Sequence, residues 1–284
     1  MGFYFFTLFL KMKNTLLLFT FIIFFTAISF AAVDTVSIYS NAMHKNIKAV
    51  VIKPNSYQKE KDFPVVYLLH GAYGNFANWI KKVPALQAYA DQYKILVVCP
   101  DGASTSWYFD SPVDTTFKFE THIGIEVPAY IDANYKTIKG RKYRAIAGLS
   151  MGGHGAIFIA FRHSETFGAC GSMSGALNVA SITKGYDVDK RLGDYERNKT
   201  FYNDFSVLNI IEKKPKDSLA IIIDCGVQDF IFPMSKAVHD KMTKLKIAHD
   251  YIERPGKHDW PYWANAVGYQ LMFFKNFFDK SESK

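Results

Sequence analysis

Short, unbroken apolar runs recur along this chain, and longer stretches whose apolar residues have helical spacing separate them. Such runs are typical of parallel strands that are covered on both faces. The runs expected to form strands are 64–69, 95–99, 143–149, 167–173, 218–225 and 248–254, after a hairpin at 35–40 and 46–53. The stretches expected to form helices are 78–93, 120–135, 151–163, 233–246 and 261–278. This alternation predicts an α/β fold with a mostly parallel central sheet and helices on both faces.

The length and composition fit a single domain. The chain has 284 residues, 49% of them hydrophobic, and no internal repeat or low-complexity linker, so we expect one domain over 32–284. The segment 176–217 is longer and more polar than a simple crossover. Long insertions in compact domains are often lids or binding loops, which makes 176–217 a candidate cap insertion. A surface excursion without that role is the alternative.

The first 31 residues have the pattern of an export signal. Lys11 and Lys13 precede an apolar run over 15–30, and Ser29 and Ala31 supply small residues before a cut after Ala31. This order of basic, apolar and small residues predicts a signal peptide at 1–31. The mature protein is then expected to be secreted or periplasmic, with no stable membrane association after cleavage. An uncleaved membrane anchor is the alternative.

Cysteine usage and charge exclude several classes of protein. Cys99, Cys170 and Cys225 each lie in or beside an apolar run, and three is an odd number, so we expect buried free thiols rather than a disulfide framework. Neither a C-x-x-C pair nor a Cys/His cluster with zinc spacing occurs, and we expect no metal or other cofactor. The net charge of +8 comes from scattered lysines and arginines without a basic stripe, so no nucleic-acid partner is expected.

Ser150 lies in the pattern G-x-S-x-G, between an expected strand and an expected helix. In the nucleophile elbow, this pattern forms a sharp strand-to-helix turn that lifts a serine hydroxyl above the sheet. Glycines are needed on both sides because a side chain would collide with neighbouring backbone in so tight a turn. Chance alone supplies the pattern in roughly one chain in ten of this length. The prediction of a nucleophile elbow therefore depends on the expected strand before the pattern and the expected helix after it. Ser150 is the candidate nucleophile.

A serine nucleophile needs a base and an acid that orients the base. Asp224 and Asp229 compete for the acid position, and we favour Asp229 because it lies beyond the turn at Gly226, where a side chain can reach over the sheet edge. His258 is the candidate base, since Pro and Gly break the strand before it and Pro261 can begin the last helix. Other histidines have structural neighbours or lie outside the expected order: His44, His122, His163, His239 and His249.

Two backbone amides are candidates for the oxyanion hole. The N–H of Met151 directly follows Ser150, and the N–H of Ala72 lies in the loop after the strand 64–69, where such a donor is expected. One donor is typically worth about 3–4 kcal/mol of transition-state stabilisation. His70, in the same loop, is expected to support the loop rather than to react. No phosphate loop, dinucleotide fingerprint or carboxylate pair of a glycosidase competes with this set.

In the segments that contain these candidate residues, the chain resembles the putative esterase family of the α/β-hydrolases. That branch includes feruloyl and acetylxylan esterases of carbohydrate esterase family one, tributyrin esterases, esterase D and the mycolyltransferases. The matching segments are LLHGAYGN (68–75), GLSMGGHGA (148–156), MSGAL (173–177), CGVQDF (225–230) and HDWPYW (258–263). They occur in family order across nearly the whole expected mature chain.

The resemblance implies an α/β-hydrolase fold with Ser150, Asp229 and His258 as the catalytic triad. It also implies a substrate-binding wall, for which we take Trp107, Trp260 and Trp263, together with Tyr73 beside the oxyanion loop. Aromatic side chains near such a site suit a phenolic or acyl group carried on a sugar. Core packing at the sheet edge is the alternative role for these aromatic residues, above all for Trp263.

The expected function is that of a secreted serine carboxylesterase working through an acyl-serine intermediate. Its substrates would be small-molecule or polysaccharide esters with short acyl, acetyl or feruloyl groups. An acyltransferase to a sugar or lipid alcohol is one alternative, and a thioesterase like S-formylglutathione hydrolase is another, although the export signal and the loop around Asn75 disfavour it. A catalytically silent carbohydrate-binding protein is the third alternative. The sequence leaves the oligomeric state open.

Overall fold

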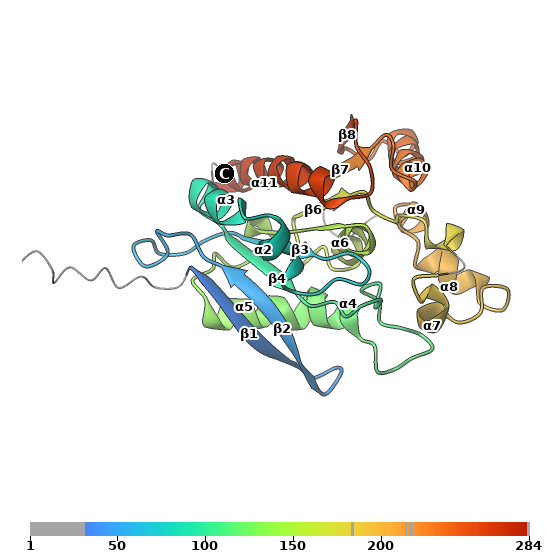
Figure 1. The fold of residues 1–284 in the computed structure, drawn as a ribbon, viewed down its shortest axis with the longest axis horizontal. Helices are drawn as coiled ribbons and strands as arrows, with labels where there is room; N and C mark the ends of the chain where they lie inside the picture. The colour runs from blue at the N-terminus through green and yellow to red at the C-terminus, as the bar shows by residue number, and fades with distance from the viewer. Residues whose placement is uncertain (1–31, 183–184, 214, 216–217, 283–284) are drawn as a thin grey trace, which may run out of the picture. The chain divides into compact units, whose positions relative to one another are not determined.

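The computed structural model describes residues 32–182, 185–213, 215 and 218–282. From Val33 onward the chain forms one compact unit around an eight-stranded sheet (Figure 1). Its strands are β1 (Val33–Ser40), β2 (Lys45–Ile52), β3 (Val65–Leu69), β4 (Leu96–Pro100), β5 (Arg144–Leu149), β6 (Ala169–Met173), β7 (Ala220–Gly226) and β8 (Asp250–Arg254). The predicted signal peptide at 1–31 lies outside the described residues.

The sheet is mostly parallel, in the order β1-β2-β4-β3-β5-β6-β7-β8. β1 and β2 form an antiparallel hairpin, and β2 pairs antiparallel with β4. From β4 to β8 every neighbouring pair is parallel. The predicted α/β class, with a mostly parallel central sheet, is therefore confirmed.

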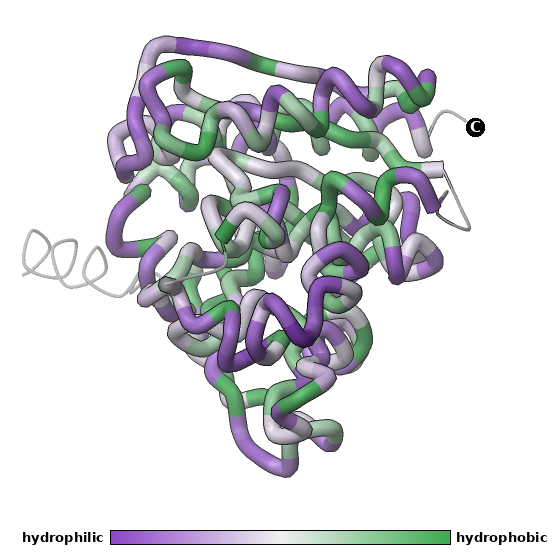
Figure 2. Tube along the Cα trace, turned by 90° about the vertical axis from the view of Figure 1, so that its right-hand side faces the viewer, coloured by the Kyte–Doolittle hydropathy of each residue, from purple (hydrophilic) through white to green (hydrophobic). Residues whose placement is uncertain are grey.

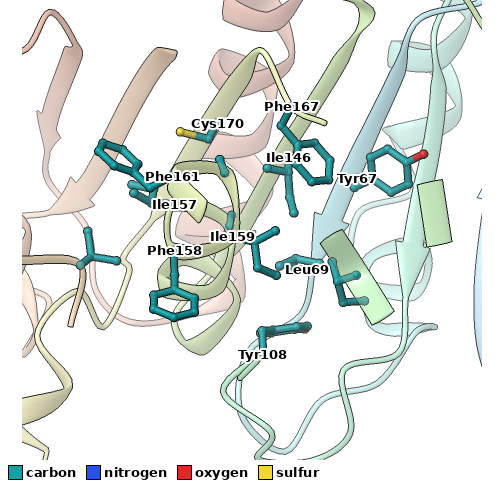
Figure 3. Close-up of a cluster of buried hydrophobic side chains, with 14 of the residues drawn as sticks. Tyr67, Leu69, Tyr108, Ile146, Ile157, Phe158, Ile159, Phe161, Phe167 and Cys170 are labelled. Atoms are coloured by element: carbon teal, nitrogen blue, oxygen red, sulfur yellow. The ribbon is translucent and has the colours of Figure 1, made fainter. Parts of the chain in front are cut away.

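Helices pack on both faces of the sheet, and successive residues of β3 alternate between the two cores. Tyr67 and Leu69 join the core that includes residues of α5 and α6, whereas Val66 and Leu68 join the core that includes residues of α3 and α11. This alternation follows from the two-residue repeat of a strand. Figure 3 shows part of the first core, where side chains of β3 and β5 lie among those of α6. The longer helices are α3 (Leu86–Tyr93), α5 (Val127–Asn134), α6 (Met151–Arg162), α10 (Phe232–Lys244) and α11 (Trp260–Glu282).

Two predicted helices are interrupted in the structure, each beside a proline. The stretch 78–93 forms α2 (Asn78–Lys82) and α3, because Pro84 has no N–H and disfavours helical backbone in the residue before it. The stretch 120–135 contains α4 (Phe119–Thr121), a π-helical turn η1 (His122–Glu126) and α5. Pro128 lacks the N–H that a regular helix would use there, which favours the wider turn.

The insertion 176–217 carries short helices in its described part. They are the 3₁₀ turn η3 (Val179–Ser181) and the helices α7 (Val188–Leu192), α8 (Lys199–Asp204) and α9 (Val207–Ile210). Another 3₁₀ turn, η2 (Arg141–Tyr143), leads into β5.

Hydrophobic and hydrophilic residues alternate along the helical turns in Figure 2, as expected for helices with one face on a core. Within the described ranges, no helix is both long and apolar enough to cross a membrane.

The three cysteines lie in or beside central strands, as predicted. Cys99, Cys170 and Cys225 are buried and free. Burial raises the pKa of each thiol, and that of Cys225 rises to about 12. These thiols are therefore protonated at neutral pH and act as small apolar side chains.

Because the strands from β4 to β8 are parallel, their carboxyl ends meet at one edge of the sheet. Ligand sites of open α/β sheets form at this edge. His70 follows β3, Ser150 follows β5 and Ser174 follows β6. Asp229 comes three residues after β7, and His258 comes four residues after β8. The topology alone therefore brings the candidate residues together.

Candidate active site

Ser150 forms a sharp turn between β5 and α6. Its backbone lies at φ 54° and ψ −120°, a strained conformation for a residue with a side chain. A Cβ on Gly148 would lie 2.4 Å from the carbonyl oxygen of Gly152, and one on Gly152 would lie 2.5 Å from that of His70. Both glycines are therefore required by close backbone packing. The Ser150 N–H donates to the Met173 carbonyl at 3.0 Å, which fixes the turn to β6.

His258 contacts both Ser150 and Asp229. Its Nδ1–H donates to Asp229 Oδ2 at 2.8 Å, with Oδ1 at 3.0 Å, and its Nε2 lies 3.0 Å from Ser150 Oγ. Since the Nδ1 proton points at the carboxylate, Nε2 is free to accept the serine proton. The imidazole lies between Phe230, at a ring-centroid distance of 4.7 Å, and Trp263 at 4.9 Å. These two rings restrict its orientation.

Asp229 is buried and remains an acceptor. Burial raises the pKa of its carboxyl group, but hydrogen bonds from His258 and from the Ile231 N–H outweigh that effect and leave the pKa below its usual value. The Ile231 N–H donates to Oδ1 at 3.0 Å. A carboxylate held ionised beside Nδ1 can stabilise the imidazolium that forms when His258 takes a proton.

The two predicted oxyanion donors lie on segments that touch each other. Met151 is the first residue of α6, and the first N–H groups of a helix have no acceptor within it. Ala72 follows Gly71, whose added Cβ would lie only 3.3 Å from the Ser150 Cβ. The next amide, that of Tyr73, donates to the Ser104 carbonyl at 2.7 Å. In the described part of the chain no acceptor takes the Ala72 N–H, so this amide is available to a ligand.

His70 supports this loop, as predicted. Its Nδ1–H donates to the Gly71 carbonyl at 2.8 Å, and its Nε2 accepts the Gly102 N–H at 2.8 Å. Burial lowers the pKa of His70, which keeps the ring neutral and able to accept. The ring thereby ties the loop after β3 to the loop after β4.

A cavity of about 210 Å³ opens at Ser150. The residues that line it come from the loop after β3, the elbow, the insertion and the start of α11. They are Gly71, Ala72, Tyr73, Gly74, Asn78, Leu149, Ser150, Tyr186, His258, Trp260 and Trp263. Of the four predicted substrate-binding residues, Tyr73, Trp260 and Trp263 line this cavity.

The fourth predicted substrate-binding residue, Trp107, lies behind the cavity wall instead of forming it. It is 2% exposed and packs on Phe109 and His154. Its Nε1–H donates to the Tyr186 carbonyl at 2.8 Å. The residue that reaches the cavity from this side is Tyr186, whose ring lies 5.9 Å from that of Tyr73.

Tyr186 was not among the substrate-binding residues predicted from the sequence. The sequence pattern that could have indicated it is an aromatic residue within the polar insertion 176–217, which was predicted only as a candidate cap. The neighbouring Asp187 accepts a hydrogen bond from Thr105 Oγ1 at 2.8 Å. Together with the Trp107 bond, this contact fixes residues 186–187 against the loop after β4.

No metal site is evident in the described ranges: they contain no group of three or more His, Cys, Asp or Glu side chains placed to hold an ion. His239 and His249, which the sequence left outside the site, lie 2.8 Å apart between Nδ1 and Nε2 and are not lining residues of the cavity. Asp224, the competing acid, is fully buried in β7 and bonds to Arg254 instead of a histidine.

A mostly parallel sheet that presents a serine, an aspartate and a histidine at its carboxyl edge, in this chain order, is the arrangement of the α/β-hydrolases. Residues 40–273 match the family model described as "Putative esterase", and the chain belongs to this family. It is a carboxylic ester hydrolase of the serine type.

The comparisons with individual proteins agree. An acetyl esterase from Caldicellulosiruptor saccharolyticus is 26% identical over 256 residues, which covers 83% of this chain and 95% of that protein. A diacylglycerol acyltransferase/mycolyltransferase from Mycobacterium gordonae is 34% identical, covering 83% of this chain and 78% of its own length. Among solved structures, a ferulic acid esterase superposes with a TM-score of 0.75 at 28% identity and covers 87% of this chain and 98% of its own. The predicted family and α/β-hydrolase fold are thus confirmed.

Proposed function

We propose that this protein is an exported serine carboxylesterase that hydrolyses short-acyl or carbohydrate-linked esters, with Ser150, His258 and Asp229 as its catalytic triad. The observation that carries the proposal is the continuous chain of contacts from Ser150 Oγ through the His258 ring to the Asp229 carboxylate. Each neighbouring pair of these three side chains lies within hydrogen-bond distance, and Ser150 and His258 line a cavity that can admit a small substrate.

The first half of the reaction forms the acyl-enzyme. Ser150 Oγ attacks the ester carbonyl carbon as its proton passes to His258 Nε2. The negative charge that develops on the carbonyl oxygen is stabilised by the N–H groups of Met151 and Ala72. When the tetrahedral intermediate collapses, the bond to the alcohol breaks and His258 gives its proton to the leaving oxygen. The acyl group is then an ester of Ser150.

The second half repeats these steps with water. His258 takes a proton from a water molecule, whose oxygen attacks the acyl carbon. The second tetrahedral intermediate collapses, the carboxylic acid leaves and Ser150 regains the proton from His258. Asp229 stays ionised throughout, in agreement with its lowered pKa, and stabilises the imidazolium each time it forms.

Cavity size and lining support the proposed substrate class. A space of about 210 Å³ suits a short acyl group better than a long chain. Tyr73 is 67% exposed and Tyr186 39% exposed, so both rings are available at the cavity mouth to pack on a flat ring. The names of the acetyl esterase and ferulic acid esterase relatives point to the same class of ester.

The decisive test is the variant Ser150→Ala. We expect it to lose 4-nitrophenyl acetate turnover and labelling by a fluorophosphonate, with an unchanged thermal melt, because only the nucleophile is removed. Ser37→Ala, at an exposed position of β1, is the matched control and should keep full activity. Turnover by the Ser150→Ala variant at the wild-type rate would contradict the proposal.

Acyl transfer is the second candidate function, favoured by the acyltransferase named among the relatives. It would use the same acyl-serine and differ only in the acceptor, a sugar or lipid alcohol in place of water. Product analysis with an added alcohol separates the two: a transferase forms mostly the new ester, and a hydrolase forms mostly the free acid. A silent carbohydrate-binding protein would bind polysaccharide without either product. The S-formylglutathione hydrolase neighbours, at 19–20% identity, share the fold.

A further inference from the structure

Asp224 is a buried carboxylate that the proposed triad does not use. It lies in β7, five residues before Asp229, and its side chain is fully buried. Arg254 Nη2–H donates to its Oδ2 at 2.5 Å, and the Tyr262 hydroxyl donates to its Oδ1. A buried carboxylate is costly unless it is paired and fully hydrogen-bonded, so a fold retains one only with such partners.

Both partners of Asp224 flank the segment that carries His258. Arg254 is the last residue of β8, and Tyr262 lies in the first turn of α11. His258 lies midway between them in the sequence, in the loop that joins the two elements. One carboxylate on the strand that leads to Asp229 therefore holds both ends of the loop that carries His258.

The guanidinium of Arg254 is fixed from several directions. Nη1–H donates to Asn265 Oδ1 at 2.7 Å, so the two ends of the guanidinium bond to β7 and to α11. Its carbon lies 4.2 Å from the ring centroid of Tyr269 and 5.3 Å from that of Tyr262. A planar group with donors on both sides can join two elements in this way, whereas the single ammonium of a lysine cannot.

The loops that carry Asp229 and His258 also bond to each other directly. The Val227 N–H donates to the Arg254 carbonyl at 2.9 Å. The Gln228 N–H donates to the Gly256 carbonyl at 3.0 Å, and the Gly256 N–H donates back to Gln228 Oε1 at 2.5 Å. These bonds set the register of the two loops, which begin after β7, the strand of Asp224, and after β8, the strand of Arg254.

The serine side is connected to the same residue. The Ser174 N–H donates to the Asp224 carbonyl oxygen at 2.8 Å. Ser174 follows Met173, whose carbonyl accepts the Ser150 N–H at 3.0 Å. Asp224 thus contacts the segments that position all three proposed catalytic residues.

We propose that Asp224, Arg254 and Tyr262 are positioning residues that hold His258 at hydrogen-bond distance from both Asp229 and Ser150. This inference rests on the proposed triad and goes beyond it, since none of the three contacts the reacting atoms. Burial raises the pKa of Asp224 even though Arg254 and Tyr262 bond to it, so these partners offset only part of the cost of burying the carboxylate.

The test compares Tyr262→Phe and Arg254→Met with the wild type. We expect kcat for 4-nitrophenyl acetate to fall by about 10- to 100-fold with KM little changed, because a displacement of about 1 Å at the reacting groups has this effect. The rate of fluorophosphonate labelling of Ser150 should fall by the same factor. Arg254→Lys, which keeps the charge but not the two-sided bonding, should lie between Arg254→Met and the wild type.

Tyr269→Phe is the matched control, since it removes a hydroxyl from a ring on the same guanidinium without removing a partner of Asp224. It should keep wild-type kcat. All rates are measured well below the melting temperature of the least stable variant, and circular dichroism checks that each variant is folded. The low-field proton resonance of the His258 Nδ1–H, which reports the bond to Asp229, should shift in Tyr262→Phe and stay in place in Tyr269→Phe.

The inference would be overturned if Tyr262→Phe, Arg254→Met and Arg254→Lys were folded and had lower melting temperatures but kept the wild-type labelling rate, kcat and His258 resonance. The cluster would then have a purely structural role. Failure of the proposed function has a different signature, because Ser150→Ala would then retain turnover. An inactive Ser150→Ala together with a fully active Tyr262→Phe rejects the positioning role alone.

Discussion

At the scale of single residues, Ser150 shows how the backbone prepares a side chain for chemistry. A residue with a side chain at φ 54° and ψ −120° costs about 1–3 kcal/mol, and the contacts of β5, β6 and α6 hold it there. The result is a hydroxyl that projects from the turn toward His258, 3.0 Å from Nε2. His258 in turn is held between two rings and a carboxylate.

Asp229→Asn tests the orienting role at this scale. An amide can offer its N–H to Nδ1, which favours the wrong tautomer of His258 and leaves Nε2 protonated. We expect kcat to fall by about 10⁴-fold while the fold persists. Assays of 4-nitrophenyl acetate hydrolysis measure the fall in kcat. Asp240→Asn, at an exposed position of α10, serves as the control. An Asp229→Asn enzyme with near wild-type kcat would reject Asp229 as the acid.

At the scale of elements, the site depends on how closely α6 approaches the loop after β3. The added Cβ of Gly152 would lie 2.5 Å from the His70 carbonyl oxygen and 2.6 Å from that of Leu69. The loop also approaches the elbow, since a Cβ on Gly71, the residue before Ala72, would lie 3.3 Å from the Cβ of Ser150, the residue before Met151. Close packing of helix and loop is therefore what assembles the proposed oxyanion hole.

Gly152→Ala should move α6 away from the loop after β3. Because the clash is with backbone atoms, we expect a loss of about 1–3 kcal/mol in the free energy of unfolding and a large fall in kcat. Urea unfolding and esterase assays measure both. In Gly268→Ala, in α11, the added Cβ meets the outer end of the Tyr89 ring, with the hydroxyl oxygen at 2.6 Å and the ring carbon that bears it at 3.1 Å. Because this is a side chain that can move and not backbone, the variant should cost less than Gly152→Ala. Full activity in folded Gly152→Ala would show that the approach of helix and loop is not needed.

A contact between α4 and the end of α6 predicts that the stability of the fold depends on pH. Glu120 of α4 bonds to Arg162 Nε at 2.6 Å and to His163 Nε2 at 3.1 Å, at the end of α6. Burial raises the pKa of Glu120 but these partners lower it below 4.5, and although burial lowers the pKa of His163, Glu120 raises it above 6.5. The pairing therefore stabilises the fold fully between about pH 4.5 and 6.5. This stabilisation is lost as the pH rises through the raised pKa of His163, and it is lost as the pH falls through the lowered pKa of Glu120.

His163→Gln should reveal this window. The variant should melt about 2–4 °C below the wild type between about pH 4.5 and 6.5, and the difference should shrink toward pH 9. Thermal melts across this range measure it. Ser37→Ala, at an exposed position of β1, removes no titratable group and should show no such trend. A melting difference that is constant from pH 5 to 9 would contradict the assignment of charge to His163.

At the scale of the whole molecule, the parallel sheet gathers residues that are far apart in the chain. The cavity combines the loop after β3, the elbow, Tyr186 from the insertion and the start of α11. All of the described residues that line it belong to the compact unit from Val33 onward. The proposed export signal lies before that unit, so its removal should leave the site intact.

Export with cleavage after Ala31 predicts a mature protein that begins at Ala32. N-terminal sequencing of the exported protein checks the cut, and protein 32–284 made directly should have the same kcat and melting temperature as the exported form. Protein that stays in the membrane fraction with residues 1–31 attached would instead support the anchor alternative.

The sequence by itself determined the strands, the regions of the longer helices, the elbow and the chain order of Ser150, Asp229 and His258. Each of these depends on local spacing: apolar runs specify strands, glycines permit the turn, and a position just after a strand specifies the sheet edge. The interruptions at 84 and 122–126 were missed because helical periodicity continues past a proline whose effect is on backbone hydrogen bonds.

Only the tertiary structure decided which aromatic residues reach the cavity and what Asp224 does. Trp107, which the sequence placed in the substrate-binding wall, lies behind that wall, and Tyr186, which the sequence did not single out, lines the cavity. The hydrogen bond from Trp107 Nε1–H to the Tyr186 carbonyl joins residues 79 apart in the chain. Asp224 finds Arg254 and Tyr262, 30 and 38 positions away, instead of a histidine. Contacts at such separations depend on how loops close over the sheet, and no local pattern of residue types encodes that closure.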